Sequence, residues 1–171
     1  MADTSAGNPA DDLQAAPWFT SRMRVRSYEL DALGHVNHAV YLNYLEQARF
    51  DALEAAGVSP DHMAREGWGV HVVRIEVDYR AECRMGDELV IRTSTTGFRN
   101  SSMTIQQTLE RCPRDPGAAP SGDEDRVTAV EARIVAVWVG PDGRPMRIPA
   151  LVRSALTGSG PRPDGSDPPP T

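Results

Sequence analysis

The residues most able to do chemistry are crowded between Asp31 and His38, in the stretch "DALGHVNH". This stretch holds a carboxylate, a glycine, two histidines and an asparagine directly before apolar residues at helical spacing. A carboxylate can act as a base or a nucleophile, and the free amides at the start of a helix can polarise a carbonyl oxygen. Residues 31–38 are therefore a candidate acyl-transfer site.

A helix is predicted to follow, with Asn37 as its N-cap and Gly57 at its end. An asparagine oxygen accepts a hydrogen bond from an amide one turn in, and glycine is common just past a helix. The first-turn amides, including that of His38, lack partners within the helix. Gly34 lets the backbone turn sharply or lets a ligand approach closely. The apolar side chains at helical spacing are Tyr41, Leu45, Ala48 and Ala52.

The same residues also fit ordinary structural roles. An aspartate before a helix is often a capping or turn residue. His35 and His38 fit histidines of a loop or of a partly buried surface. The local pattern alone leaves both interpretations open.

Strand patterns surround the helix. Alternation of side chains in residues 22–30 predicts a half-buried strand. Residues 68–80 predict a second strand, with His71, Val73, Ile75, Val77 and Tyr79 on one face. Three further strands are predicted over residues 89–98, 103–111 and 126–139.

The connections complete the pattern. Asp142-Gly143 is a strong hairpin-turn signal, residues 112–125 read as a long polar loop, and residues 149–156 suggest one or two closing helical turns. The order of one strand, one long helix and then four or five strands predicts an α+β fold. We expect a single helix packed on one face of an antiparallel sheet.

Composition favours one domain. The ends, residues 1–19 and 157–171, are rich in Pro, Gly, Ser and Asp, so we expect disordered tails around a folded unit of residues 20–156. Apolar runs are short and no basic leader is present, which predicts a cytoplasmic protein without a membrane partner. The net charge of −6 is concentrated in the ends and in residues 112–126, so no nucleic-acid surface is expected. Cys83 and Cys112 lack metal-ligand spacing, and no lysine is present for Schiff-base chemistry.

The stretch "YELDALGHVNHAVYLNYLEQAR" resembles the hotdog-fold thioesterases of the 4-hydroxybenzoyl-CoA thioesterase family. Members carry a D-x-x-G-x-V-like segment, then a Tyr-containing helix that often ends in Glu-x-Ala-Arg. The matching residues here are Asp31, Gly34, Val36, Tyr41, Tyr44, Glu46, Ala48 and Arg49. The resemblance extends to "DYRAECRMGDELVIRTSTTGFRNSSM" and "GRPMRIP", and so covers nearly all of residues 20–156. It implies a hotdog fold, in which an antiparallel sheet wraps around one central helix.

The resemblance also implies roles for residues. Asp31 matches the catalytic aspartate of the family, and the backbone amide that polarises the thioester carbonyl falls at His38. The basic turn that binds the nucleotide end of CoA falls at residues 98–102. Plant acyl-carrier-protein thioesterases suggest a positioning role for His35, although Leu33 stands where they carry an asparagine. The substrate contacts expected from these matches are Gly34, His35, Asn37, Tyr41, Arg99, Asn100 and Ser102.

Two glutamates near Asp31, Glu29 and Glu46, are given other roles than Asp31. Glu29 stands where the family has the first acid of an Asp-x-Asp pair, and we expect it to keep that residue's role. Glu46 and Arg49 lie three apart on the predicted helix, so we expect an intrahelical or subunit-contact ion pair.

The resulting hypothesis is hydrolysis of an acyl or aryl thioester to a carboxylic acid and free CoA, without metal or cofactor. Acyl-CoA is the expected substrate, an acyl carrier protein is the alternative donor, and the family implies a homodimer or homotetramer. A non-catalytic acyl-thioester binder is the second hypothesis, and a hotdog dehydratase or hydratase the third. The sequence does not choose the acyl group, nor between a nucleophilic and a general-base Asp31.

Overall fold

The computed structural model describes residues 17–112 and 126–158. In chain order the elements are β1 (Phe19–Arg24), a 3-10 turn (Ser27–Glu29), α1 (His38–Ala55), α2 (Pro60–Glu66), β2 (Gly69–Tyr79), β3 (Glu88–Phe98), β4 (Ser102–Cys112), β5 (Val127–Val139) and α3 (Ala150–Leu156). Most of the two predicted tails and of the 112–125 loop lies outside the described residues. The last residue of the predicted N-terminal tail, Phe19, already belongs to β1.

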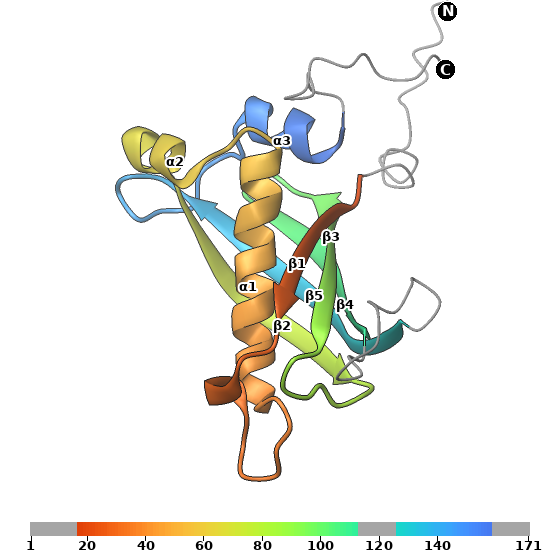
Figure 1. Ribbon diagram of the computed structural model, residues 1–171. Helices are drawn as coiled ribbons and strands as arrows, with labels where there is room; N and C mark the ends of the chain where they lie inside the picture. The colour runs from red at the N-terminus through yellow and green to blue at the C-terminus, as the bar shows by residue number, and fades with distance from the viewer. Residues whose placement is uncertain (1–16, 113–125, 159–171) are drawn as a thin grey trace, which may run out of the picture.

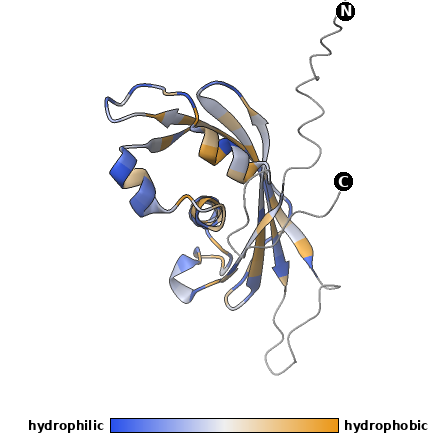
Figure 2. Cartoon of the chain, turned by 90° about the horizontal axis from the view of Figure 1, so that it is seen from above, coloured by the Kyte–Doolittle hydropathy of each residue, from blue (hydrophilic) through white to orange (hydrophobic). Residues whose placement is uncertain are grey.

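The five strands form one antiparallel sheet in the order β1-β3-β4-β5-β2. Helix α1 crosses one face of this sheet and packs against β1 and β3 (Figure 1). Figure 2 looks along α1 and shows the sheet bending around it. A single central helix held in a curved antiparallel sheet is the predicted arrangement, although α1 has only 18 residues and two short helices accompany it.

Helix α1 begins and ends where its sequence signals predict. The Asn37 side chain accepts a hydrogen bond from the Ala39 amide at 2.9 Å, and Gly57 follows the helix with φ of 80°. Leu45, Ala48 and Ala52 are at most 3% exposed. Small alanines on this face let the sheet approach the helix closely, and burial of apolar area stabilises the contact by about 25 cal/mol per Å².

Three local predictions are wrong or incomplete. The first strand ends at Arg24 rather than running to residue 30, because the next residues turn around the Glu29 carboxylate, which accepts from the Arg26 amide at 2.6 Å. Helix α2 was not predicted, although Ser59 caps it and Pro60 occupies its first turn. The Asp142-Gly143 turn does form, but it returns the chain to a single bridge at Pro145 instead of a sixth strand.

Strand β2 also departs from the predicted alternation. Its pairing with β5 shifts by one residue between Val72 and Arg74, so Val73 is the extra residue of a bulge. Residues directly opposite in an antiparallel pair share a face. Opposite the buried Trp138, Ala136, Ile134, Ala132 and Val130 lie Val70, Val72, Ile75, Val77 and Tyr79. The prediction that His71 and Val73 share a face with Ile75, Val77 and Tyr79 is therefore wrong.

Strand β2 forms one edge of the sheet, and no other strand of the described chain covers it. Several of its large apolar side chains are exposed, with Val73 at 60% and Tyr79 at 49%. An edge of eleven residues with exposed apolar side chains is a template for pairing with another strand. Among the described residues, no helix is long and apolar enough to cross a membrane.

Candidate active site

Asp31 lies in a tight, exposed loop at the mouth of α1. Its Oδ1 accepts hydrogen bonds from the amides of Leu33 at 2.8 Å and His35 at 3.3 Å. The Asp31 amide donates to the His35 carbonyl at 2.8 Å, and Gly34 closes the turn with φ of 80°. No described residue bonds to Oδ2. The loop thus fixes one carboxylate oxygen and leaves the other available to a ligand.

His38 is the first residue of α1, so its backbone amide has no partner within the helix. The two residues after His38 donate their amides to Asn37. The Ala39 amide donates to the Asn37 side chain and the Val40 amide to the Asn37 carbonyl, both at 2.9 Å. The His38 amide has no partner among the described residues, and it sits at the positive end of the helix dipole. It is suited to polarising a carbonyl oxygen, a function that does not require the exposed imidazole of His38.

Glu29 holds this loop from beneath. It is 7% exposed, and its Oε2 accepts from the Tyr44 hydroxyl at 2.5 Å as well as from the Arg26 amide. Its carbonyl accepts from the Asn37 amide at 3.0 Å. Burial, followed by the hydrogen bond to Glu29, raises the pKa of Tyr44. Glu29 therefore ties the segment before the helix to the second turn of α1.

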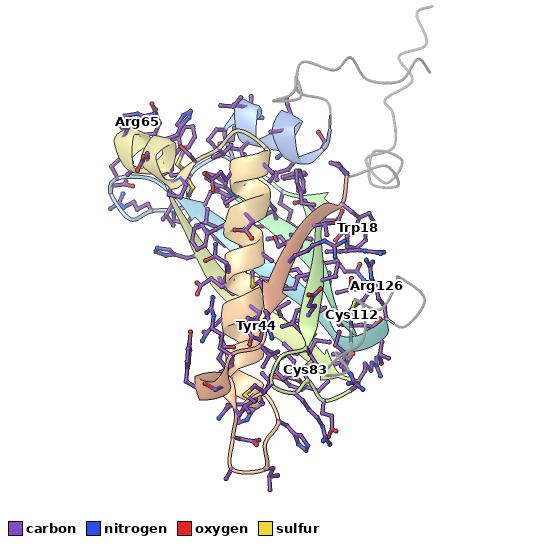
Figure 3. All side chains as sticks on the ribbon, in the orientation of Figure 1. Trp18, Tyr44, Arg65, Cys83, Cys112 and Arg126 are labelled. Carbon is purple, nitrogen blue, oxygen red and sulfur yellow. The ribbon has the colours of Figure 1, made fainter. Side chains whose placement is uncertain are left out.

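Two of the predicted substrate contacts are occupied by protein partners. The Tyr41 hydroxyl is buried and accepts from the Cys83 amide at 3.0 Å. The His35 ring places Nε2 at 3.1 Å from a Glu82 carboxylate oxygen and at 3.4 Å from Arg84. These contacts fasten the loop and α1 to the segment after β2, which carries Cys83 at the same end of the molecule as Tyr44 (Figure 3).

The predicted nucleotide turn lies at the opposite end of the sheet. Arg99 donates its amide to the Ser102 carbonyl at 2.7 Å, and Arg99 and Asn100 are exposed. Ser102 pairs with Val137, which pairs with His71 near the start of β2, whereas Tyr79 at the end of β2 bonds to His38. Helix α1 separates the two ends by about 27 Å at 1.5 Å per residue. One chain therefore does not bring Asp31 and the turn together (Figure 1).

An apolar cavity lies between α1 and the sheet, closer to the turn than to Asp31. Its apolar lining includes Phe50 and Leu53 of α1 and Val70 and Val72 of β2. Tyr41, which was predicted to contact the substrate, is buried in the core and does not line this cavity. The closeness of the cavity residues depends on the bulge in β2 and on the curvature of the sheet, which local sequence patterns do not show.

Arg49 reaches this cavity from α1. Its Nη1 donates to the Gln107 side chain at 2.9 Å, and burial lowers its pKa, an effect that the nearby Glu46 carboxylate opposes. Gln107 is fully buried and donates to the Leu45 carbonyl at 2.9 Å and the Thr93 hydroxyl at 2.8 Å. The Glu46 carboxylate affects Arg49 through its charge, as the predicted intrahelical pair implies. The hydrogen bond of Arg49, however, goes to Gln107 of the sheet, which the prediction did not include. The sequence signal for it was a glutamine between two inward-facing apolar residues, Ile105 and Leu109.

Within residues 17–112 and 126–158, no group of three or more His, Cys, Asp or Glu side chains is arranged to hold a metal ion.

Residues 25–156 match the family described as the thioesterase-like superfamily. The chain belongs to this superfamily. It is 30% identical, over 77% of its length, to a chloroplastic acyl-acyl carrier protein thioesterase of Arabidopsis thaliana, and it spans 64% of the length of that relative. Among solved structures, it is similar to a Thermus thermophilus thioesterase complexed with coenzyme A and Zn, with 30% identity, 88% and 98% of the two chains covered and a TM-score of 0.67.

The fold is that of the hotdog thioesterases. A 4-hydroxybenzoyl CoA thioesterase mutant complexed with 4-hydroxybenzoyl CoA superposes with a TM-score of 0.70 over 81% of this chain and 98% of its own. At 20% identity this likeness shows the fold alone. It confirms the fold predicted from the sequence.

Proposed function

We propose that the protein is an acyl-CoA thioesterase. The observation that carries the proposal is the mouth of α1, where neither Asp31 Oδ2 nor the His38 amide has a partner among the described residues. A carboxylate and a helix N-terminal donor in one loop are the two groups that hydrolysis of a thioester can use. A relative named an acyl-acyl carrier protein thioesterase and a solved thioesterase complexed with coenzyme A support the reaction class.

The chemistry follows one of two balanced routes. As a general base, Asp31 removes a proton from water, the hydroxide adds to the carbonyl carbon, the C–S bond breaks and the thiolate takes up the proton. As a nucleophile, Asp31 adds to the same carbon and expels the thiolate, and water then hydrolyses the mixed anhydride. In both routes the His38 amide stabilises the oxyanion, and the products are a carboxylic acid and a thiol.

We further propose that the working unit is at least a homodimer formed through β2. Antiparallel pairing of two β2 strands about a two-fold axis places the Tyr79 end of one beside the Gly69 end of the other. The Asp31 loop of one subunit then lies at the end that holds the cavity and the nucleotide turn of its partner. The acyl group would enter that apolar cavity, and the turn would receive the CoA nucleotide. A tetramer and a cytoplasmic location stay predictions from the sequence.

The test is release of free thiol from a panel of aryl, short-chain and medium-chain acyl-CoAs and acyl carrier proteins. We expect hydrolysis of at least one acyl-CoA, with loss of activity in Asp31→Asn and normal activity in Asp61→Asn, an exposed aspartate on α2. Binding of acyl-CoA without turnover by the native protein would instead favour the non-catalytic binder. Activity confined to acyl carrier proteins would replace CoA as the substrate.

A further inference from the structure

The first turn of α1 receives a hydrogen bond from the edge strand β2. The Tyr79 hydroxyl donates to the His38 carbonyl at 2.9 Å, a contact that spans 41 positions of the sequence. His38 is the residue whose backbone amide is the oxyanion donor of the proposed reaction. The terminal turns of a helix fray because fewer hydrogen bonds hold them. A bond from the sheet to this residue therefore bears on where its amide lies.

The Tyr79 ring is itself held by a second tyrosine. Its centre lies 5.5 Å from that of the Tyr41 ring, with 69° between the planes, which is edge-to-face geometry. Tyr41 is buried and its hydroxyl accepts from the Cys83 amide, so it offers Tyr79 a fixed surface. This contact sets the direction in which the Tyr79 hydroxyl points. A change to phenylalanine would keep the ring contact and remove only the hydroxyl.

The backbone groups beside the His38 amide are bonded to the rest of the chain. The Asn37 amide donates to the Glu29 carbonyl at 3.0 Å, and the Ala39 amide donates to the Asn37 side chain at 2.9 Å. With Tyr79 on the His38 carbonyl, the backbone is fixed on both sides of the His38 amide, which has no partner of its own among the described residues. A donor that is ordered in advance needs no reorganisation when charge develops on a carbonyl oxygen.

We infer that Tyr79 is a positioning residue for the proposed thioester hydrolysis. Its hydroxyl holds the first residue of α1, so that the His38 amide is directed at the thioester carbonyl. Tyr79 acts through the backbone of His38 and does not itself contact the reacting atoms. The inference rests on the proposed function and adds a residue of the sheet to the machinery at the helix mouth. Because Tyr79 belongs to β2, the oxyanion donor is also tied to the strand through which the proposed dimer forms.

The kinetic experiment compares Tyr79→Phe with the native protein on the acyl-CoA that the native protein hydrolyses. We expect kcat to fall about fivefold, the effect of one hydrogen bond, with KM unchanged. The split between kcat and KM follows because the His38 amide acts on the oxyanion of the transition state more than on the bound substrate. Tyr28→Phe is the matched control, since the exposed Tyr28 hydroxyl accepts from Arg26 and does not contact α1. Its kcat should equal that of the native protein.

A second measurement reports the position of the amide without turnover. The NMR order parameter of a backbone amide is about 0.85 where the backbone is rigid and below about 0.6 where it is flexible. We expect the His38 amide to be rigid in the native protein and in Tyr28→Phe, and to become more flexible in Tyr79→Phe. The melting temperatures of the three proteins should agree, since Tyr79 is 49% exposed and keeps its ring contact.

The contrary outcomes separate this inference from the proposed function. An active native protein with equal kcat in Tyr79→Phe would overturn the inference and leave thioester hydrolysis intact. A rise in KM at constant kcat would also overturn it, because Tyr79 would then be a substrate contact. If the native protein hydrolyses no thioester, the proposed function fails and the order parameter alone decides. An unchanged order parameter for His38 in Tyr79→Phe would show that the hydroxyl does not position the amide.

Discussion

The two ends of α1 differ in how their polar groups are used. At the Asp31 end, many polar atoms of the loop are bonded within the chain, while Asp31 Oδ2 and the His38 amide have no partner among the described residues. At the far end the chain offers an apolar cavity and two exposed arginines, Arg99 and Arg147. The first arrangement suits a reaction, which needs a few fixed groups, and the second suits recognition of a large substrate. The comparison teaches that one chain carries both halves of a site but holds them apart.

The largest expected effect comes from removing the chemistry at the first end. Asp31→Asn should lower kcat by roughly 10²- to 10⁴-fold. The asparagine oxygen can still accept the Leu33 and His35 amides, so the melting temperature should stay unchanged. Asp31→Ala should lose the same activity and also about 1 kcal/mol of stability, since it loses those hydrogen bonds. Steady-state kinetics and thermal melting of both variants check this, and full activity of Asp31→Asn would remove Asp31 from the mechanism.

The next effect concerns the second end and the hydrogen bonds behind the cavity. Gln107→Leu should lower the free energy of unfolding by about 2 to 3 kcal/mol, because it leaves Arg49, the Leu45 carbonyl and the Thr93 hydroxyl without their partner. Gln106→Leu is the matched control, since this neighbouring glutamine is exposed on the outer face. Urea unfolding of the two variants measures the difference. Similar stabilities would mean that the buried glutamine contributes nothing specific.

The stability of the protein should depend on pH through the Cys83 thiol, which is buried near the Asp31 end. Burial raises the pKa of the Cys83 thiol to about 11. The unfolded thiol ionises near pH 9, so the folded state holds more protons between those values and stability falls as the pH rises. The fall should be about 1 kcal/mol per pH unit above 9, measured by urea unfolding at pH 8, 9 and 10. Cys83→Ala should flatten this decline, and Cys112→Ala should keep it. An identical slope in all three proteins would contradict the assignment to Cys83.

The smallest effect tests the link between the two ends. Val73→Asp puts a carboxylate on the free edge of β2. Pairing with a second strand would remove water from this carboxylate, which costs free energy. We expect a loss of roughly 1 kcal/mol in association, about fivefold in the dimer dissociation constant, with activity per chain becoming dependent on concentration. Val127→Asp makes the same change on an interior strand and should have no effect on association. Sedimentation velocity decides, and an unchanged dimer in Val73→Asp would place the interface elsewhere.

Local signals predicted much of this molecule. The cap at Asn37, the glycine after α1 and the alternation in the later strands gave α1 and β2 to β5 nearly as they occur, because these features depend on neighbours in sequence. The early end of β1 was missed because a side chain, that of Glu29, competes with the strand for the backbone. The bulge at Val73 was missed because one extra residue leaves no mark in a run of apolar side chains.

The site shows the same division. Asp31 and the His38 amide are adjacent in sequence, and the structure keeps them at one helix mouth. The contact between Arg49 and Gln107 spans 58 positions, and the bond from Arg153 to Arg99 spans 54, so neither can be read from spacing. Asp31 and residues 98–102 were both predicted to contact the substrate, and they lie at opposite ends of one chain.

The bulge in β2 gives the strand a spare residue. Removing Val73 would leave a regular strand in which Val70 and Val72 still lie opposite Trp138 and Ala136, so the lining of the cavity would be preserved. Removing Val72 as well would bring His71 to the position opposite Ala136 and put an imidazole where the cavity now has a methyl surface. The strand can therefore lose one residue without changing what the cavity presents, and the second loss would change its chemistry.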